Sequence, residues 1–187
     1  ARKQQALSRH MEDFAWLYRR LADYRSRKTL YAILSNWYRY DFVTTSQAKE
    51  YLFSSYFDLD LLSCDENEVI VDLGAYIGDT VLTYLEQYGE DCYKKIYCYE
   101  ITPGTFEQLQ KNLAGYRDID LRQKGISDVE GFMSLAVNAA STSANTLSDE
   151  TGGEIPVTTL DADIQEPVTL IKADIEGHEQ RALLGAK

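Results

Sequence analysis

The sequence predicts an α/β fold in which a helical segment precedes a parallel sheet covered by helices. From Val69 onward, short runs rich in β-branched and aromatic residues alternate with stretches of helical periodicity, a pattern typical of parallel sheets. Before that point, apolar residues recur at helical spacing. The length of 187 residues suits one domain with an appendage. We therefore divide the chain into a helical segment, residues 1–55, and a sheet domain, residues 56–187.

The helical segment is predicted to contain three helices. An apolar stripe predicts the first over residues 4–23, Ser26 can cap the second, and the third covers residues 46–55. Residues 1–40 hold nine Lys and Arg against three Asp and Glu, although the whole chain carries a net charge of −11. This basic segment has four interpretations: a segment that docks on the acidic body, a lid, a dimerisation element that makes the protein a homodimer, or an arm that binds a partner or an anion.

The elements of the sheet domain follow in order along the chain. Main strands are expected at residues 68–74, 94–100, 119–127 and 168–174. Helices are expected over residues 79–88, 103–113 (with Thr102 as N-cap) and from residue 177. Two further strands, residues 131–137 and 155–161, flank a polar stretch, residues 138–154, which is either a surface insertion or a flap over a pocket. Because such a sheet normally continues past its fourth strand, we expect C-terminal strands to be missing from this sequence.

Composition limits the classes of partner. The net charge of −11 disfavours nucleic acid, because phosphate binding needs a basic face. No apolar run approaches the roughly 20 residues that span a bilayer, and the basic N-terminus lacks the apolar core of a signal peptide. The three cysteines form no C-x-x-C pair, so no zinc site is indicated. We expect a cytoplasmic protein that binds neither nucleic acid nor membrane and holds no metal ion.

The stretch VDLGAYIGDT predicts a strand, a glycine turn and a helix N-terminus, which together form nucleotide-sized pockets. A dinucleotide fingerprint needs glycines where this chain has Tyr76 and Asp79, and a tyrosine there obstructs the approach of a pyrophosphate. A ligand with a ribose and a cationic end fits better, and S-adenosyl-L-methionine (SAM) has both. The expected cofactor contacts in this stretch are Asp72, Gly74, Ala75, Tyr76 and Gly78.

Two later positions extend this site. Glu100 ends the next strand, where a carboxylate can accept both hydroxyls of a ribose. NAD enzymes use the same device, so Glu100 indicates adenosine rather than methyl transfer. The spacing of Asp72, Gly74 and Gly78 resembles motif I of class I methyltransferases, which have a Rossmann-like sheet. That resemblance implies that Ser127 and Asp128 approach the adenine, the alternative being a simple turn.

Five stretches together resemble the FkbM family of SAM-dependent methyltransferases: VDLGAYIGDT, YEITPGTFEQL, GISDVEG, VTTLD and VTLIKADIEGHEQRALLGAK. The most specific element is K-x-D-x-E-G-x-E at residues 172–179, and the resemblance covers residues 51–187. It implies a class I Rossmann-like sheet, SAM as cofactor and methyltransferase activity. Two departures stand out: Ile101 follows Glu100 where many members have proline, and the later strands that complete the substrate side are absent. The second departure leaves the substrate open.

The family element supplies candidate catalytic residues, namely Asp174, Glu176 and His178. Asp174 should face the methionine amino group, as a further cofactor contact, or the substrate hydroxyl, and a histidine is suited to act as a base near neutral pH. Structural roles are also open: Glu176 could fix the turn through backbone amides, and Glu179 could cap the helix. We expect O-methylation of a small metabolite or sugar. The alternatives are N-methylation, a nicotinamide-dependent oxidoreductase, and a non-catalytic adaptor with a residual nucleoside pocket.

Overall fold

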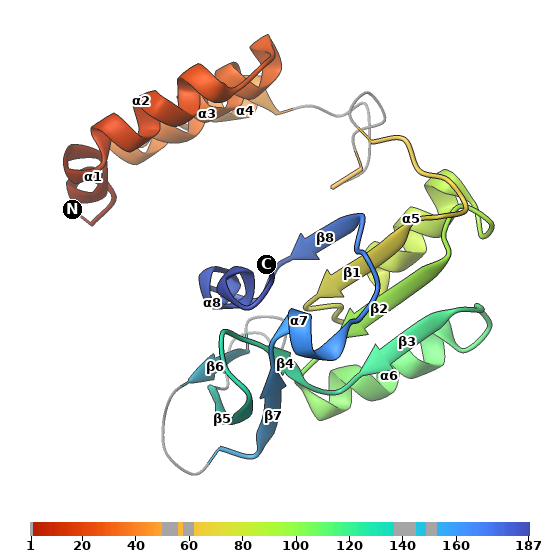
Figure 1. Cartoon of the computed structure of the whole chain (residues 1–187). Helices are drawn as coiled ribbons and strands as arrows, with labels where there is room; N and C mark the ends of the chain where they lie inside the picture. Colours follow the sequence, from red (N-terminus) through yellow and green to blue (C-terminus); the bar gives the residue numbers. More distant parts are fainter. Residues whose placement is uncertain (1, 50–55, 58–61, 137–144, 149–152) are drawn as a thin grey trace. The chain divides into compact units, whose positions relative to one another are not determined.

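The computed structural model describes residues 2–49, 56–57, 62–136, 145–148 and 153–187. The chain divides into two compact units, residues 1–54 and 55–187. As Figure 1 shows, the described part of the first unit is helical, and the strands belong to the second. No helix within the described residues has both the length and the apolar character of a membrane span.

The described part of the first unit contains the helices α1 (Arg2–Arg9), α2 (Met11–Arg20), α3 (Tyr24–Arg39) and α4 (Phe42–Ala48). Helix α3 contacts both α1 and α4. The prediction of one helix over residues 4–23 is wrong, because His10 leaves the helical conformation with φ −118° and ψ 24° and separates α1 from α2. The apolar stripe therefore continues across a break that periodicity does not reveal.

Aspartate side chains set the starts of α3 and α4. Asp23 accepts hydrogen bonds from the backbone N–H and the hydroxyl of Ser26, at 2.8 and 2.6 Å, so Asp23 and not Ser26 is the N-cap. Asp41 binds Thr44 in the same way, at 2.9 and 2.6 Å, and starts α4 at Phe42 rather than at residue 46. Residues 50–55 of the third predicted helix lie outside the described residues.

The main sheet has four parallel strands: β1 (Val69–Leu73), β2 (Lys95–Tyr99), β3 (Ile119–Arg122) and β8 (Leu170–Ala173). Their order is β3-β2-β1-β8, so β1 lies between β2 and β8. In this register Asp72 lies opposite Cys98 on one side and Lys172 on the other. This topology confirms the α/β fold with a parallel Rossmann-like sheet.

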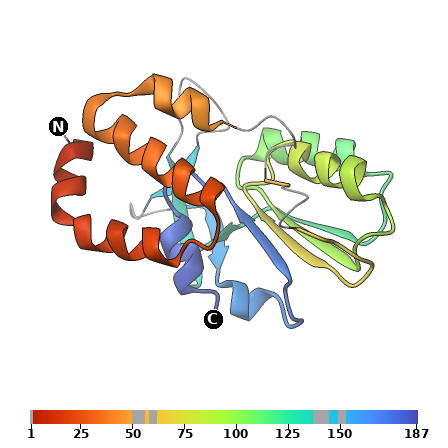
Figure 2. The same cartoon turned by 90° about the horizontal axis from the view of Figure 1, so that it is seen from above.

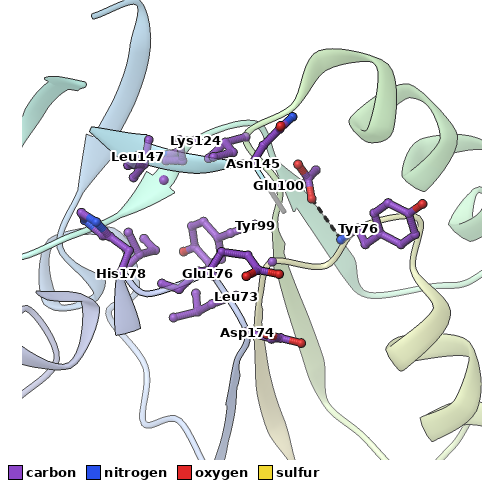
Figure 3. Close-up of a pocket in the computed structure, with 15 residues that line it drawn as sticks. Leu73, Tyr76, Tyr99, Glu100, Lys124, Asn145, Leu147, Asp174, Glu176 and His178 are labelled. Atoms are coloured by element: carbon purple, nitrogen blue, oxygen red, sulfur yellow. Dashed lines mark hydrogen bonds between the residues drawn. The ribbon is translucent and has the colours of Figure 1, made fainter. Parts of the chain in front are cut away.

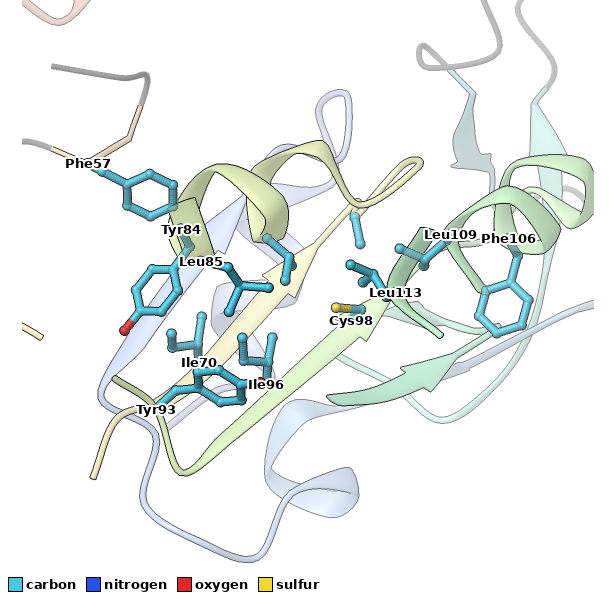
Figure 4. Packing of buried hydrophobic residues seen from close by; sticks show 12 residues of the cluster. Phe57, Ile70, Tyr84, Leu85, Tyr93, Ile96, Cys98, Phe106, Leu109 and Leu113 are labelled. Carbon is cyan, nitrogen blue, oxygen red and sulfur yellow. The ribbon is translucent and has the colours of Figure 1, made fainter. Parts of the chain in front are cut away.

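Helices cover both faces of the main sheet. Helices α5 (Asp79–Tyr88) and α6 (Pro103–Leu113) lie on one face, and α7 (Leu160–Asp163) and α8 (Glu179–Leu184) lie on the other (Figures 1 and 2). Because side chains alternate along a strand, Ile70 packs toward α5 while Val71 packs toward α7. Figure 4 shows the cluster under α5 and α6, which includes Tyr84, a fully buried residue of α5.

A second, smaller sheet has the order β4-β7-β5-β6 and contains β4 (Gly125–Ile126), β5 (Gly131–Ala136), β6 (Thr146–Ser148) and β7 (Ile155–Thr158). The single strand predicted over residues 119–127 is wrong, because Arg122 pairs with Tyr99 in the main sheet whereas Ile126 pairs with Thr158 in the second. Strand β6 lies inside the predicted loop, residues 138–154, of which 138–144 and 149–152 are outside the described residues. Whether this stretch is an insertion or a flap stays a prediction.

Candidate functional site

The glycine turn joins β1 to α5 over the carboxyl end of the main sheet. Three of its residues have left-handed backbone conformations: Gly74 (φ 77°), Tyr76 (φ 49°) and Gly78 (φ 88°). The N–H groups of Gly74 and Ala75 both donate to the Tyr99 carbonyl, at 3.0 and 2.9 Å. A Cβ atom at Gly74 would lie 2.1 Å from the Asp174 carbonyl oxygen, so the close approach of β8 requires glycine here.

Glu100 lies beside this turn and is bound to it. Its Oε2 accepts from the Tyr76 N–H at 3.1 Å, and its Oε1 accepts from the Thr102 N–H at 2.7 Å. The residue is buried, and this burial raises the pKa of its carboxyl group, although the backbone donors oppose the shift. A carboxylate has about four acceptor positions, more than these two N–H groups occupy.

A pocket opens between the ends of the two sheets (Figure 3). Among the predicted site residues, its lining includes Gly74, Tyr76, Glu100, Asp174, Glu176 and His178. The predicted residues Asp72, Ala75, Gly78, Ser127 and Asp128 are outside this lining. The lining also contains residues that no sequence motif indicated, above all Tyr99, Lys124, Asn145 and Leu147. Leu147 comes from β6, inside a stretch predicted as a loop, so periodicity gave no signal for it.

Lys124 is the cationic side chain in this lining, and it has an anionic partner. Its Nζ lies 2.8 Å from Oδ1 of Asp163, a carboxylate that also pairs with Arg122 at 2.6 Å and accepts from the Tyr99 hydroxyl at 2.7 Å. Asp120 also pairs with Arg122, at 2.8 Å, so the network holds two carboxylates against two cations and balances the charge of Lys124. The wall is therefore less suited to a ligand phosphate than an unpaired lysine would make it.

Asp72 has a different environment from the one predicted. Its carboxylate is buried and lies 2.9 Å from the ammonium of Lys172, which also donates to the Gly74 carbonyl at 2.8 Å. Burial raises the pKa of the Asp72 carboxyl, and the Lys172 charge opposes this shift. Asp72 was expected to contact the cofactor, but its carboxylate is buried against Lys172 and lies outside the pocket lining. Lys172 begins the K-x-D-x-E-G-x-E element, but the sequence assigned it no function.

Asp174 directly follows β8 and lines the pocket, at the strand end where the sequence predicts it. Its side chain is exposed, and its Oδ2 accepts from the Tyr56 hydroxyl at 2.9 Å. This hydrogen bond is the largest of the causes that raise the pKa of Tyr56 to about 12. An exposed carboxylate in this position is available to a cationic group or a hydroxyl of a ligand.

The turn after β8 is fixed by Glu179. Glu176 and Gly177 both have left-handed backbone conformations, with φ 56° and 98°. Oε1 of Glu179 accepts from the N–H groups of Ile175 and Gly177, at 3.0 and 3.2 Å. The suggestion that Glu176 fixes this turn is therefore wrong, since Glu179 supplies the acceptor. Glu176 instead has an exposed side chain at the pocket wall.

His178 is buried and bonded to Ser127, whose Oγ lies 3.1 Å from Nε2. Ser127 donates its one hydroxyl proton to Oδ1 of Asp128 at 3.0 Å, so Nε2 of His178 carries a proton and donates to Ser127. Asp128 also pairs with Arg181 of α8 at 2.8 Å, which lowers the pKa of its carboxyl group. In Figure 3 the His178 ring lies at the opposite end of the pocket from Glu100, with its nitrogens turned away.

These hydrogen bonds give Ser127 and Asp128 a different role from the predicted one. Both were predicted to approach an adenine, but Ser127 is fully buried and Asp128 is directed to α8. These hydrogen bonds connect the residues directly after β4 to α8 and so fix the position of the pocket wall. Within the described residues, no group of three or more His, Cys, Asp or Glu is placed to hold a metal ion.

Known proteins resemble this chain to different degrees. Residues 72–187 match the methyltransferase FkbM domain. The structure of methyltransferase FkbM from Methylobacillus flagellatus KT matches with a TM-score of 0.80 and 26% identity, over 98% of this chain and 46% of that one. The chain thus spans less than half the length of that protein. No curated protein matches the sequence.

Two other methyltransferase structures match only in part. They are an rRNA methylase from Streptococcus thermophilus (TM-score 0.29, 17% identity, 33% of each chain) and phosphoethanolamine N-methyltransferase 1 from Haemonchus contortus (0.29, 18%, 38% of this chain and 16% of that one). Their low TM-scores carry no argument about this site. The family assignment depends on the domain match, which covers most of the chain. Since that match includes the glycine turn, Glu100 and the K-x-D-x-E-G-x-E element, the chain belongs to the FkbM family of methyltransferases.

Proposed function

We propose that this chain binds SAM in the pocket beside the glycine turn and takes part in methylating a hydroxyl of a small metabolite or sugar. The observation that carries the proposal is the Glu100 carboxylate, buried at the pocket and fixed by the Tyr76 N–H at 3.1 Å. A ribose offers two neighbouring hydroxyls, which suit the remaining acceptor positions of a carboxylate.

Charge favours SAM over a dinucleotide. Two exposed carboxylates, Asp174 and Glu176, line the pocket, while the ammonium of Lys124 is paired with Asp163. A pyrophosphate would meet these carboxylates unfavourably, whereas the sulfonium and ammonium of SAM would be attracted to them. The same charge pattern does not distinguish O-methylation from N-methylation of an acceptor.

Bound SAM supplies a methyl group on a positively charged sulfur, which a nucleophile displaces in line. For that reaction we assign Glu100 to the ribose hydroxyls and Asp174 to the methionine ammonium. Glu176 is assigned to accept the acceptor's proton, because its carboxylate is exposed at the pocket wall whereas Nε2 of His178 is committed to Ser127. His178 then orders the wall through Ser127. The acceptor, a homodimer and a cytoplasmic location remain predictions from the sequence.

Calorimetry with SAM, S-adenosylhomocysteine and NAD tests the proposal on the wild type and on Glu100→Ala. We expect micromolar binding of both adenosyl ligands, a loss of roughly 100-fold in the variant, and no binding of NAD; this loss corresponds to about 2.7 kcal/mol. Binding of NAD alone would favour the oxidoreductase. Binding of no ligand would favour the adaptor. Once SAM binding is measured, paired hydroxyl and amine acceptors distinguish O-methylation from N-methylation.

A further inference from the structure

We propose that Lys172 is a positioning residue that fixes the glycine turn by bonding the Gly74 carbonyl, while Asp72 neutralises its charge. The proposal concerns this chain's own contacts, and only its ligand readout rests on the proposed function. Lys172 lies on β8, and Asp72 and Gly74 lie on β1 and in the turn that follows it.

The sheet register places these groups together. Lys172 lies directly opposite Asp72 in the parallel β1–β8 pair, and its Nζ is 2.9 Å from Oδ1 of Asp72 and 2.8 Å from the Gly74 oxygen. The side chain of Lys172 is 10% exposed and that of Asp72 is 2% exposed. A buried ammonium needs an opposite charge and hydrogen-bond acceptors, and Asp72 and Gly74 supply both. The Tyr56 ring adds a cation–π contact, with its centroid 5.7 Å from Nζ.

Besides its own hydrogen bond from the Gly78 N–H to the Ala75 carbonyl, at 2.8 Å, the turn is held by contacts from neighbouring elements. Left-handed conformations at Gly74, Tyr76 and Gly78 follow one another closely, and the non-glycine residue among them is strained. Strand β2 holds the turn through the Tyr99 carbonyl, and β8 holds it through Lys172. A shift of the turn would move the Tyr76 N–H away from Glu100. Lys172 thus acts on the proposed ribose contact through the backbone.

The Asp72–Lys172 pair also implies different roles for Asp72 and Asp174. Asp72 is buried and its charge is matched by Lys172, so it is not the counter-charge for a ligand ammonium. Asp174 is exposed at the pocket, and its carboxylate oxygen accepts from a neutral tyrosine hydroxyl. We therefore expect Asp72 and Lys172 to act on every ligand that uses the turn, and Asp174 only on ligands that carry an ammonium.

Hydrogen exchange of the peptide that spans residues 72–80 tests the role without any ligand. The variants are Asp72→Asn, Lys172→Met, the double variant Asp72→Asn/Lys172→Met, and Lys94→Met as the matched control in an exposed ion pair. We expect exchange about tenfold faster wherever Lys172 is absent, the equivalent of one hydrogen bond from a charged donor. Lys94→Met should stay close to the wild type, and Asp72→Asn should exchange more slowly than the double variant, because Lys172 keeps its bond to the Gly74 carbonyl.

The double variant decides the proposal, because Lys172→Met alone leaves a buried carboxylate without a counter-charge and can fail to fold. Wild-type exchange in the double variant would overturn the proposal, since Lys172 would then only neutralise Asp72. Fast exchange in Asp72→Asn equal to that of the double variant would also overturn it, by making Asp72 the anchor.

Ligand binding extends the same test. The double variant should lose about tenfold in affinity both for SAM and for 5′-methylthioadenosine, which lacks the amino-acid part of SAM. Asp174→Asn should lose affinity for SAM alone. If the wild type binds neither ligand, the proposed function fails, while hydrogen exchange still decides the role of Lys172.

Discussion

The two ends of the pocket are built by different means. At the glycine turn, backbone groups make most of the contacts. The N–H groups of Gly74 and Ala75 donate to the Tyr99 carbonyl, and the Tyr76 N–H donates to the Glu100 carboxylate. At the end of β8, exposed side chains dominate, with Asp174 and Glu176 at the pocket wall. A backbone-built region tolerates little substitution, whereas exposed side chains can change without disturbing the sheet. Under the proposed function, the cofactor would contact both regions, through Glu100 and Asp174, and the acceptor would meet Glu176.

The largest effect on stability should come from Gly74→Ala, which changes the glycine turn. Its Cβ would lie 2.1 Å from the Asp174 oxygen, at a φ of 77°. We expect a loss of about 2–4 kcal/mol in the free energy of unfolding, measured by urea denaturation. Gly104→Ala in α6 is the matched control, because no atom lies within 4 Å of that Cβ. A helical Gly→Ala change should be neutral or slightly stabilising. Equal losses of unfolding free energy in Gly74→Ala and Gly104→Ala would contradict the prediction that the glycine turn is intolerant of substitution.

Acidification should weaken the ligand at the same end. Burial raises the pKa of Glu100, and a protonated carboxyl loses acceptor capacity toward a ribose. Calorimetry with SAM should therefore show affinity falling as the pH drops through this raised pKa, and Glu100→Ala should remove that dependence. The stability effect has the opposite sign. The contribution of Glu100 to the free energy of unfolding is fully present below its unfolded pKa and is lost as pH rises through its folded pKa.

A smaller effect is expected at the other end from Tyr56→Phe. The Tyr56 hydroxyl donates to Asp174 at 2.9 Å, and both side chains are exposed. Removal of this hydroxyl should change the free energy of unfolding by less than about 0.5 kcal/mol. SAM affinity should change by about twofold to fivefold, since Asp174 keeps its charge but loses one orienting hydrogen bond. An effect as large as that of Gly74→Ala would place Tyr56 in the structural part of the site.

Sequence patterns predicted the elements that repeat and missed the contacts that join distant elements. The strand at residues 69–73, the following helix and the proline-started α6 were all predicted correctly, because hydrophobic periodicity and capping residues are local signals. Glu100 was placed at the pocket from its position after β2. By contrast, the Asp72–Lys172 pair joins residues 100 positions apart along the chain, and no local pattern records that β8 pairs with β1. The break at His10 and strand β6 likewise left no signal in the hydrophobic pattern.

The smallest predicted effect concerns Asp128, where motif reasoning and geometry disagree. A residue bonded to an adenine amine would lose roughly tenfold in SAM affinity on substitution by Asn, about 1.4 kcal/mol. Geometry instead directs Asp128 to Arg181 and Ser127, outside the pocket lining. We therefore expect Asp128→Asn to change SAM affinity by less than about twofold. Its effect on the free energy of unfolding should be small, because solvent screens this partly exposed ion pair. Arg181→Met should reproduce both results, since it breaks the same pair from α8. A tenfold loss of SAM affinity in Asp128→Asn alone would restore the adenine contact and would mean that Asp128 leaves Arg181 when ligand binds.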